Sequence, residues 1–204
     1  MAIKPTLKDE ATILDPVVLP GREDIKNWKA VIDEIPRGIK KRIIALVSDG
    51  IRGGAWLAKE QGWRQQRCHF HLIAELQKIR GKRKRLIGRS IREKIYRIVR
   101  MLLTTNDPFK GTSLGRQLRY QIRKPDCPKR ARMIVRELLR HLTAFHLYLE
   151  YPEWGLPNTT GVMESVGSSV RTGAGKINTP QALFKWATAI IRTHPKFVCK
   201  KTII

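Results

Sequence analysis

The sequence predicts an α/β fold with a mainly parallel sheet that is interrupted by a large, basic α-helical insertion. Two observations indicate this class. Strand-like and helix-like segments alternate up to about residue 78. Beyond that point, residues 78–140 contain 21 Lys or Arg and only four acids. We therefore expect three units along the chain, covering residues 1–78, 79–155 and 156–204.

The first predicted elements are a strand and a helix. Residues 10–19 are rich in β-branched and aliphatic side chains, which predicts a strand, and Asp15-Pro16 interrupts it. The next apolar residues recur at helical spacing as far as Pro36, which cannot continue a helix. These residues are Ile25, Trp28, Ile32 and Ile35.

A continuous apolar run at residues 43–47 predicts a strand buried on both faces. Ser48-Asp49-Gly50 follows it as a turn. Alternation of strands and helices over this part of the chain is typical of a parallel sheet. The remaining elements predicted here are a helix over 55–61, a strand over 64–68 and a helix over 70–79.

The basic region predicts helices and a polyanionic partner. Apolar residues recur at helical spacing over 91–102 and 134–142, with breaks around TTNDPFKGTS and KPDCPK. The whole chain has 41 Lys or Arg against 17 acids, a formal net charge of +24, which repels itself unless phosphates are near. We expect DNA or RNA to contact the segment from Lys78 to Arg100, which hardly alternates in sign. The candidate DNA-binding residues are Lys82, Arg83, Lys84, Arg85, Arg89 and Arg171.

The C-terminal part predicts two more helices. The first follows the loop YPEWGLPNTTG and carries Glu164, with Arg171 on the same helix face. The second begins at Thr179-Pro180, since proline is favoured at the first helical position. We expect this last helix to bury Leu183, Trp186 and Ile190.

Two acids are candidates for chemistry. Asp49 follows the best strand candidate, and ligands in open α/β sheets bind outside the carboxyl ends of strands. A plain Asp-Gly turn would look the same. Glu164 lies among Met163 and small residues, which is not the setting of an ordinary surface acid, although this pattern alone does not decide its role.

Cys68 and His71 form a Cys-x-x-His pair at the start of a predicted helix. Such a pair can be half of a zinc site, but Cys127, His141 and His146 are distant and irregularly spaced as further ligands. The alternative is a small buried thiol beside a hydrogen-bonded histidine. We expect His69, which alternates with its neighbours, to face outward. Three cysteines at irregular spacing argue against a disulfide framework.

Taken in order, the motifs ALVSDG, QRCHFHLIAEL, the basic helical insertion and NTTGVMESVGSSVR resemble DDE transposases of bacterial insertion sequences, in the Mutator-like group. The resemblance covers roughly residues 10–193. It implies an RNase H-like mixed sheet, with a core formed by residues 1–78 and 156–204. It also implies that Asp49 and Glu164 are catalytic metal ligands and that Cys68 and His71 brace the active site.

The resemblance further implies Mg²⁺-dependent hydrolysis and strand transfer at transposon ends. The family's first catalytic Asp ends a strand upstream of all the motifs seen here. We therefore expect an N-terminally truncated form that binds metal weakly and is inactive alone unless a partner chain or self-association supplies that residue. The expected location is cytoplasmic and nucleoid-associated, because no segment reads as a signal peptide or membrane span.

Two other functions remain open from the sequence. One is a non-catalytic DNA-binding protein, whose binding would not depend on Asp49. The other is a basic RNA-binding or ribosome-associated protein, which would prefer structured RNA. The chain is only 7% aromatic, and it shows no pattern of stacking residues that would favour RNA.

Overall fold

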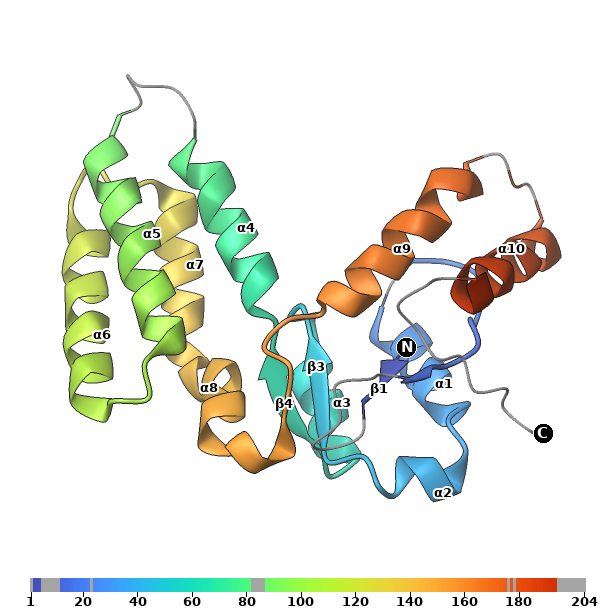
Figure 1. Cartoon of the computed structure of the whole chain (residues 1–204). Helices are drawn as coiled ribbons and strands as arrows, with labels where there is room; N and C mark the ends of the chain where they lie inside the picture. The colour runs from blue at the N-terminus through green and yellow to red at the C-terminus, as the bar shows by residue number, and fades with distance from the viewer. Residues whose placement is uncertain are drawn as a thin grey trace.

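The computed structural model describes residues 2–4, 12–22, 24–81, 87–175, 177 and 179–193. Over these residues the protein is mainly helical, with one two-stranded parallel sheet and one two-stranded antiparallel sheet (Figure 1). The elements of the first half are β1 (Ala2–Ile3), β2 (Thr12–Ile13), α1 (Ile25–Asp33), α2 (Arg37–Lys40), β3 (Ala45–Ser48), α3 (Gly54–Glu60), β4 (Arg64–Arg67) and α4 (His69–Arg80).

The second half of the described chain contains seven further helical elements. They begin with four long or medium α-helices, continue with one short 3₁₀ helix, and end with an α-helical pair. These elements are α5 (Arg89–Thr104), α6 (Pro108–Arg123), α7 (Lys129–Arg140), α8 (Leu142–Glu150), η1 (Pro152–Trp154), α9 (Gly161–Ala174) and α10 (Pro180–Thr193).

The β3–α3–β4 unit confirms the predicted α/β class. β3 and β4 pair in parallel, with Ala45 opposite Arg64 and Ser48 opposite Arg67, and α3 makes the crossover. The prediction that the 43–47 strand is buried on both faces is wrong, since most of β3 is only half-buried. Among the described residues this sheet has two strands, so each strand has one partner strand.

The described residues of the predicted strand over 10–19 begin at Thr12, and they form strand only in β2, which pairs antiparallel with β1. Pro16 lies just beyond β2 and removes a backbone donor, in line with the expected interruption.

The helix predicted after this strand forms as α1. Its N-cap is Asp24, whose carboxylate accepts from the Asn27 backbone N–H at 2.9 Å. Ile32 and Ile35 then pack with Leu57 of α3 in one small apolar cluster.

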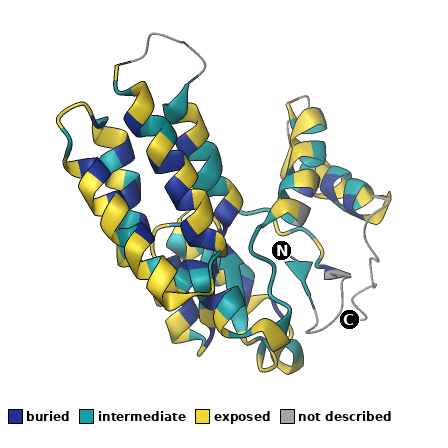
Figure 2. Ribbon diagram, turned by 60° about the vertical axis from the view of Figure 1, so that its left-hand side comes forward, coloured by how far each residue is buried: buried dark blue, intermediate teal, exposed yellow. Residues whose placement is uncertain are grey.

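Helices α4 to α8, called here the helical bundle, hold the largest apolar core of the described residues. Val99, Leu102, Leu118, Val135 and Leu138 are fully buried in it, and Figure 2 shows the buried faces turned toward one another. The breaks predicted between helices occur at 105–107 and 124–128. At the first break the Asp107 carboxylate caps α6, with proline as the first helical residue.

The α9–α10 pair lies on the opposite side of the β3–β4 sheet from the helical bundle (Figure 1). Its apolar cluster is small and joins Val166 and Ile191 to Ile13 of β2. The prediction that α10 buries Leu183, Trp186 and Ile190 is wrong in register. The buried residues are Ala187 and Ile191, while those three side chains are half-buried. No described helix combines the length and the apolar composition needed to cross a bilayer.

Candidate functional site

Asp49 lies directly after the carboxyl end of β3, and its side chain is exposed. Gly50 follows with a φ of 94°, in the region that favours glycine. A Cβ at Gly50 would overlap the guanidinium of Arg67, which crosses the turn from β4. The turn therefore needs glycine both for its backbone conformation and for this close approach. Asp49 makes no hydrogen bond or ion pair with any other described residue.

Cys68 lies between β4 and α4 and is the N-cap residue of α4. Its backbone N–H donates to the Ser48 carbonyl at 2.7 Å, which continues the pairing of β3 and β4 by one more bond. Its side chain is 1% exposed. The sulfur accepts from the backbone N–H and the hydroxyl of Thr160, both at 3.3 Å, and lies 3.5 Å from Nδ1 of His71. Cys68 thus ties the end of the sheet to the loop before α9.

Glu164 lies in the first turn of α9, where a carboxylate is stabilised by the helix dipole. Its Oε1 lies 3.4 Å from the Thr160 hydroxyl and 3.5 Å from Nε2 of His71. The loop before α9 is fixed in turn by the His69 backbone N–H, which donates to the Asn158 carbonyl at 2.8 Å. Glu164 is therefore placed by contacts with the start of α4 as well as by its own helix.

The electrostatics of these groups are coupled through His71. Burial by itself lowers the His71 pKa, but the hydrogen bond to Cys68 and the negative charges of Cys68, Glu164 and Asp49 outweigh it and raise that pKa. Burial raises the Cys68 pKa, and the hydrogen bonds from Thr160 and His71 outweigh it and lower that pKa. Asp49 and Glu164 thus act on one imidazole from two different elements. Asp49, Cys68, His71, Thr160 and Glu164 are called the sheet-edge cluster below.

The sheet-edge cluster fits a divalent cation only in part. Carboxylate oxygens are the ligands that Mg²⁺ prefers, and Asp49 and Glu164 offer two such groups without a lysine or arginine ion pair to any described residue. No set of three or more His, Cys, Asp or Glu side chains among the described residues is arranged to hold a metal. A closed two-metal site would need at least one more acid than these two.

His69 does not face outward as expected. It is buried, and its Nε2 lies 2.8 Å from the carbonyl oxygen of Phe145 in α8. Burial lowers its pKa. Gln66 is also fully buried and links the same elements, with Nε2 donating to the Phe145 carbonyl at 3.1 Å and Oε1 accepting from the Tyr148 N–H at 3.0 Å.

Sequence reasoning missed Thr160 and Arg67. Thr160 lies four residues before Glu164, one helical turn away, and that spacing was the available signal. Arg67 donates from Nη1 to Oε1 of Glu137 in α7 at 3.0 Å and lies over the Phe145 ring, 5.0 Å from its centroid. It connects the turn at Gly50 to the helical bundle.

Of the six predicted DNA-binding residues, the structure describes two, Arg89 and Arg171. Lys82, Arg83, Lys84 and Arg85 lie outside the described residues. Arg89 is exposed at the start of α5. Arg171 is exposed on α9, two turns beyond Glu164, with its guanidinium over Gly167.

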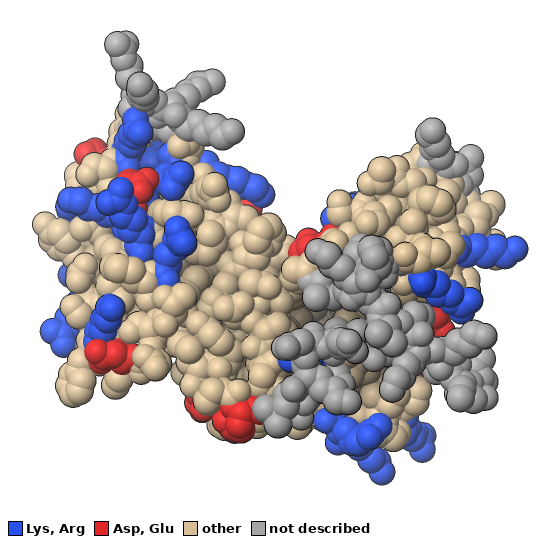
Figure 3. All heavy atoms as spheres, viewed as in Figure 1, with Lys and Arg blue, Asp and Glu red and all other residues tan. Residues whose placement is uncertain are grey.

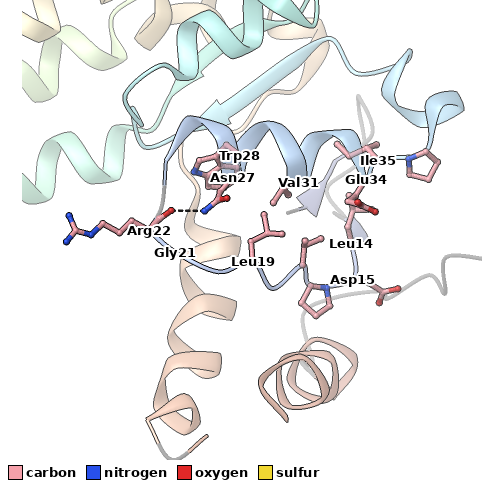
Figure 4. Close-up of a pocket in the computed structure, with 13 residues that line it drawn as sticks. Leu14, Asp15, Leu19, Gly21, Arg22, Asn27, Trp28, Val31, Glu34 and Ile35 are labelled. Atoms are coloured by element: carbon pink, nitrogen blue, oxygen red, sulfur yellow. Dashed lines mark hydrogen bonds between the residues drawn. The ribbon is translucent and has the colours of Figure 1, made fainter. Parts of the chain in front are cut away.

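A separate hollow of about 540 Å³ lies between residues 14–22 and α1 (Figure 4). Apolar side chains such as Leu14, Leu19 and Val31 make up most of its wall. The Asn27 side chain closes one end by donating to the Arg22 carbonyl at 2.8 Å. None of the five residues of the sheet-edge cluster lines this hollow, so the candidate site is not placed there.

Comparison of the chain with protein-family models, with curated proteins and with solved structures found no match.

Proposed function

We propose that this chain carries part of the active site of a DDE-type transposase with an RNase H-like core, which acts on DNA. The observation that supports this proposal is the contact of Glu164 Oε1 with Nε2 of His71 at 3.5 Å, which joins α9 to the start of α4. The negative charge of Asp49, at the end of β3, also helps to raise the His71 pKa. The parallel β3–α3–β4 unit, with Asp49 at its carboxyl end, is compatible with such a core.

In this proposal Asp49 and Glu164 hold a divalent cation, Mg²⁺ by preference. When bound, the cation supplies charge stabilisation at the reacting phosphate. The reaction is an in-line displacement, in which water or a DNA 3′-hydroxyl forms a new P–O bond and the 3′ oxygen leaves. Thr160 and His71 orient the Glu164 carboxylate, and Cys68 holds both of them against the end of the sheet.

Because two carboxylates suit one weakly held ion, we further propose that a third acid comes from another strand or a partner chain. The described part of this chain then binds DNA and metal without efficient catalysis. A divalent cation held by Asp49 and Glu164 would strengthen DNA binding, because its charge would offset that of the two carboxylates near the phosphates.

The test is fluorescence anisotropy with a labelled duplex in EDTA and in Ca²⁺ or Mg²⁺. We expect several-fold tighter binding with the cation for the wild type and no gain for the D49N/E164Q variant. The matched control, E34Q/E153Q, removes two exposed carboxylates elsewhere and should keep the cation effect. An equal gain in both variants would contradict the proposal.

A second candidate is a nucleic-acid-binding protein without catalysis. It is favoured by the net charge of +24 and by the lack of a three-ligand group among the described residues. Under this alternative, D49N/E164Q binds DNA as the wild type does, with the same salt dependence and no cation effect. A preference for structured RNA over duplex DNA in competition would favour its RNA-binding form.

A further inference from the structure

The helical bundle has a groove of about 660 Å³ between α6 and α7, outside the sheet-edge cluster. Its floor is formed by Ile122 and Leu139. Its remaining lining is entirely cationic, and the space-filling view shows Lys and Arg side chains gathered over the helical bundle (Figure 3). The five residues, called the arginine groove, are Arg119, Arg123, Arg132, Arg136 and Arg140.

Helical spacing places these arginines in two rows. Arg119 and Arg123 are four residues apart on α6, and Arg132, Arg136 and Arg140 follow the same spacing on α7. Four residues rise about 6 Å along a helix, so the rows extend about 6 and 12 Å. The turn at 124–128 brings the two helices side by side (Figure 1).

The charge of the groove is poorly compensated within the chain. Arg119, Arg123 and Arg136 form no ion pair with any described residue. Arg140 pairs with Glu137 at 3.3 Å, but this carboxylate also pairs with Arg67 at 3.0 Å. Guanidinium groups that line one groove repel one another unless an anion lies between them.

Arg132 adds an independent observation. Its Nη2 donates to the Lys124 and Cys127 carbonyls, at 3.3 and 3.4 Å, which fixes the side chain at the mouth of the 124–128 turn. Its Nε is buried and has no hydrogen-bond partner among the described residues. A buried donor without a partner is unfavourable, and a ligand oxygen that reached it would remove this cost.

We propose that the arginine groove binds the sugar-phosphate backbone of duplex DNA. The choice of DNA rests on the proposed function. The choice of a backbone rests on the two rows, since guanidinium groups repeated along a groove suit a line of phosphates better than one small anion. Among the described residues no aromatic side chain lines the groove, which disfavours a single strand held by base stacking. Phosphate contacts of this kind position DNA without reading its sequence.

The test compares R119Q/R136Q with R37Q/K59Q, which removes the same charge from exposed positions on α2 and α3. Anisotropy of a labelled duplex is measured in EDTA at several salt concentrations. We expect the groove variant to bind roughly tenfold more weakly near 150 mM salt, with a log–log salt slope smaller by about two. The control should change neither the affinity nor the slope by as much as half of this. Equal effects in the two variants would overturn the proposal.

A second measurement uses the unmodified protein, so it does not depend on how the variants fold. Arginines are treated with phenylglyoxal with and without duplex DNA, and the modified positions are read by mass spectrometry. Protection of Arg119, Arg123 and Arg136 by DNA, with continued reaction of Arg37, is expected. Equal reaction of these positions with and without DNA would overturn the proposal.

Competition separates the sources of phosphate. Unlabelled duplex DNA should displace the probe, whereas inorganic phosphate at 10 mM should not. Displacement by inorganic phosphate, or by duplex RNA at lower concentration than DNA, would overturn the assignment to DNA. Failure of the metal site is distinguished from failure of the groove because D49N/E164Q should bind DNA in EDTA as the wild type does.

Discussion

The helical bundle and the sheet-edge cluster are stabilised in different ways. The bundle buries a continuous apolar core in which residues such as Val99 and Leu138 are fully enclosed. The sheet-edge cluster is held by hydrogen bonds around Cys68 and Thr160, and α9 packs through only a small apolar cluster. The comparison indicates that the helical bundle is a rigid support for the arginine groove. The geometry of the sheet-edge cluster depends instead on a few polar contacts.

The largest expected loss of stability comes from a cavity in the core of the helical bundle. L118A removes a fully buried side chain enclosed by several helices, and it should lower the free energy of unfolding by about 4 kcal/mol. I191A in the small α9–α10 cluster should cost only about 2 kcal/mol, because the cluster has only three buried members and fewer contacts are lost there. Urea denaturation measures both. A greater loss of unfolding free energy for I191A than for L118A would contradict the view that the bundle core contributes most of the stability.

The next effect is a difference in pH response between the two regions. Burial lowers the pKa values of His69 and His146, which bond backbone carbonyls in the bundle. The stability they contribute is complete above their unfolded pKa, about 6.5, and falls as pH drops through the lower folded values. His71 has a raised pKa, so its contribution is complete below about 6.5 and is lost as pH rises through the folded value.

Denaturation at pH 5 to 8 measures this response. We expect the H146Q variant to lose part of the drop in unfolding free energy below pH 6.5, which is on the order of 1 kcal/mol. The H71Q variant should instead flatten the profile above pH 6.5. Identical profiles for the two variants would contradict the opposite signs.

A smaller effect should follow from cutting the link between the regions. R67M keeps much of the apolar length of the side chain but removes the Arg67–Glu137 ion pair, which is partly buried. We expect a loss of about 1–2 kcal/mol in unfolding free energy, larger than for R97M, whose pair with Glu93 is on the surface. Thermal and urea unfolding of both variants test the ranking, which an equal loss would contradict.

The smallest expected loss of stability comes from removing the Thr160 hydroxyl. T160V removes the hydroxyl that lies 3.3 Å from the Cys68 sulfur and 3.4 Å from the Glu164 carboxylate, while keeping the shape of the side chain. The cost in stability should be about 1 kcal/mol. The cation-dependent gain in DNA binding should fall in the same variant. T159V, one residue earlier, is the control, and a loss of the gain there as well would contradict a specific role for Thr160.

Much of the local structure followed from the sequence. The turn at Asp49, the strand before Cys68 and the helix carrying Glu164 all form close to where periodicity and turn residues predicted them. The outward position predicted for His69 is wrong because alternation applies within a strand, and His69 is already the first residue of α4. The α10 register is wrong by one residue, since the buried side chains are those of Ala187 and Ile191.

Other features depend on contacts that no local pattern contains. The arginine groove forms only when α6 and α7 fold back on each other, since its residues lie on both sides of the 124–128 turn. The contact of Thr160 with Cys68 joins residues 92 positions apart. Spacing along one helix could indicate each half of these features, but it could not indicate which halves meet.

The most direct test of the central claim, that Asp49 and Glu164 share one cation, is localised cleavage by bound Fe²⁺. With ascorbate and peroxide, an Fe²⁺ ion in a Mg²⁺ site produces hydroxyl radicals that cut the polypeptide nearby. The prediction is paired cuts next to residues 49 and 164, suppressed by excess Mg²⁺, absent in D49N/E164Q and retained in E34Q/E153Q. Cuts at only one of these positions, or a cleavage pattern that D49N/E164Q leaves unchanged, would contradict the shared site.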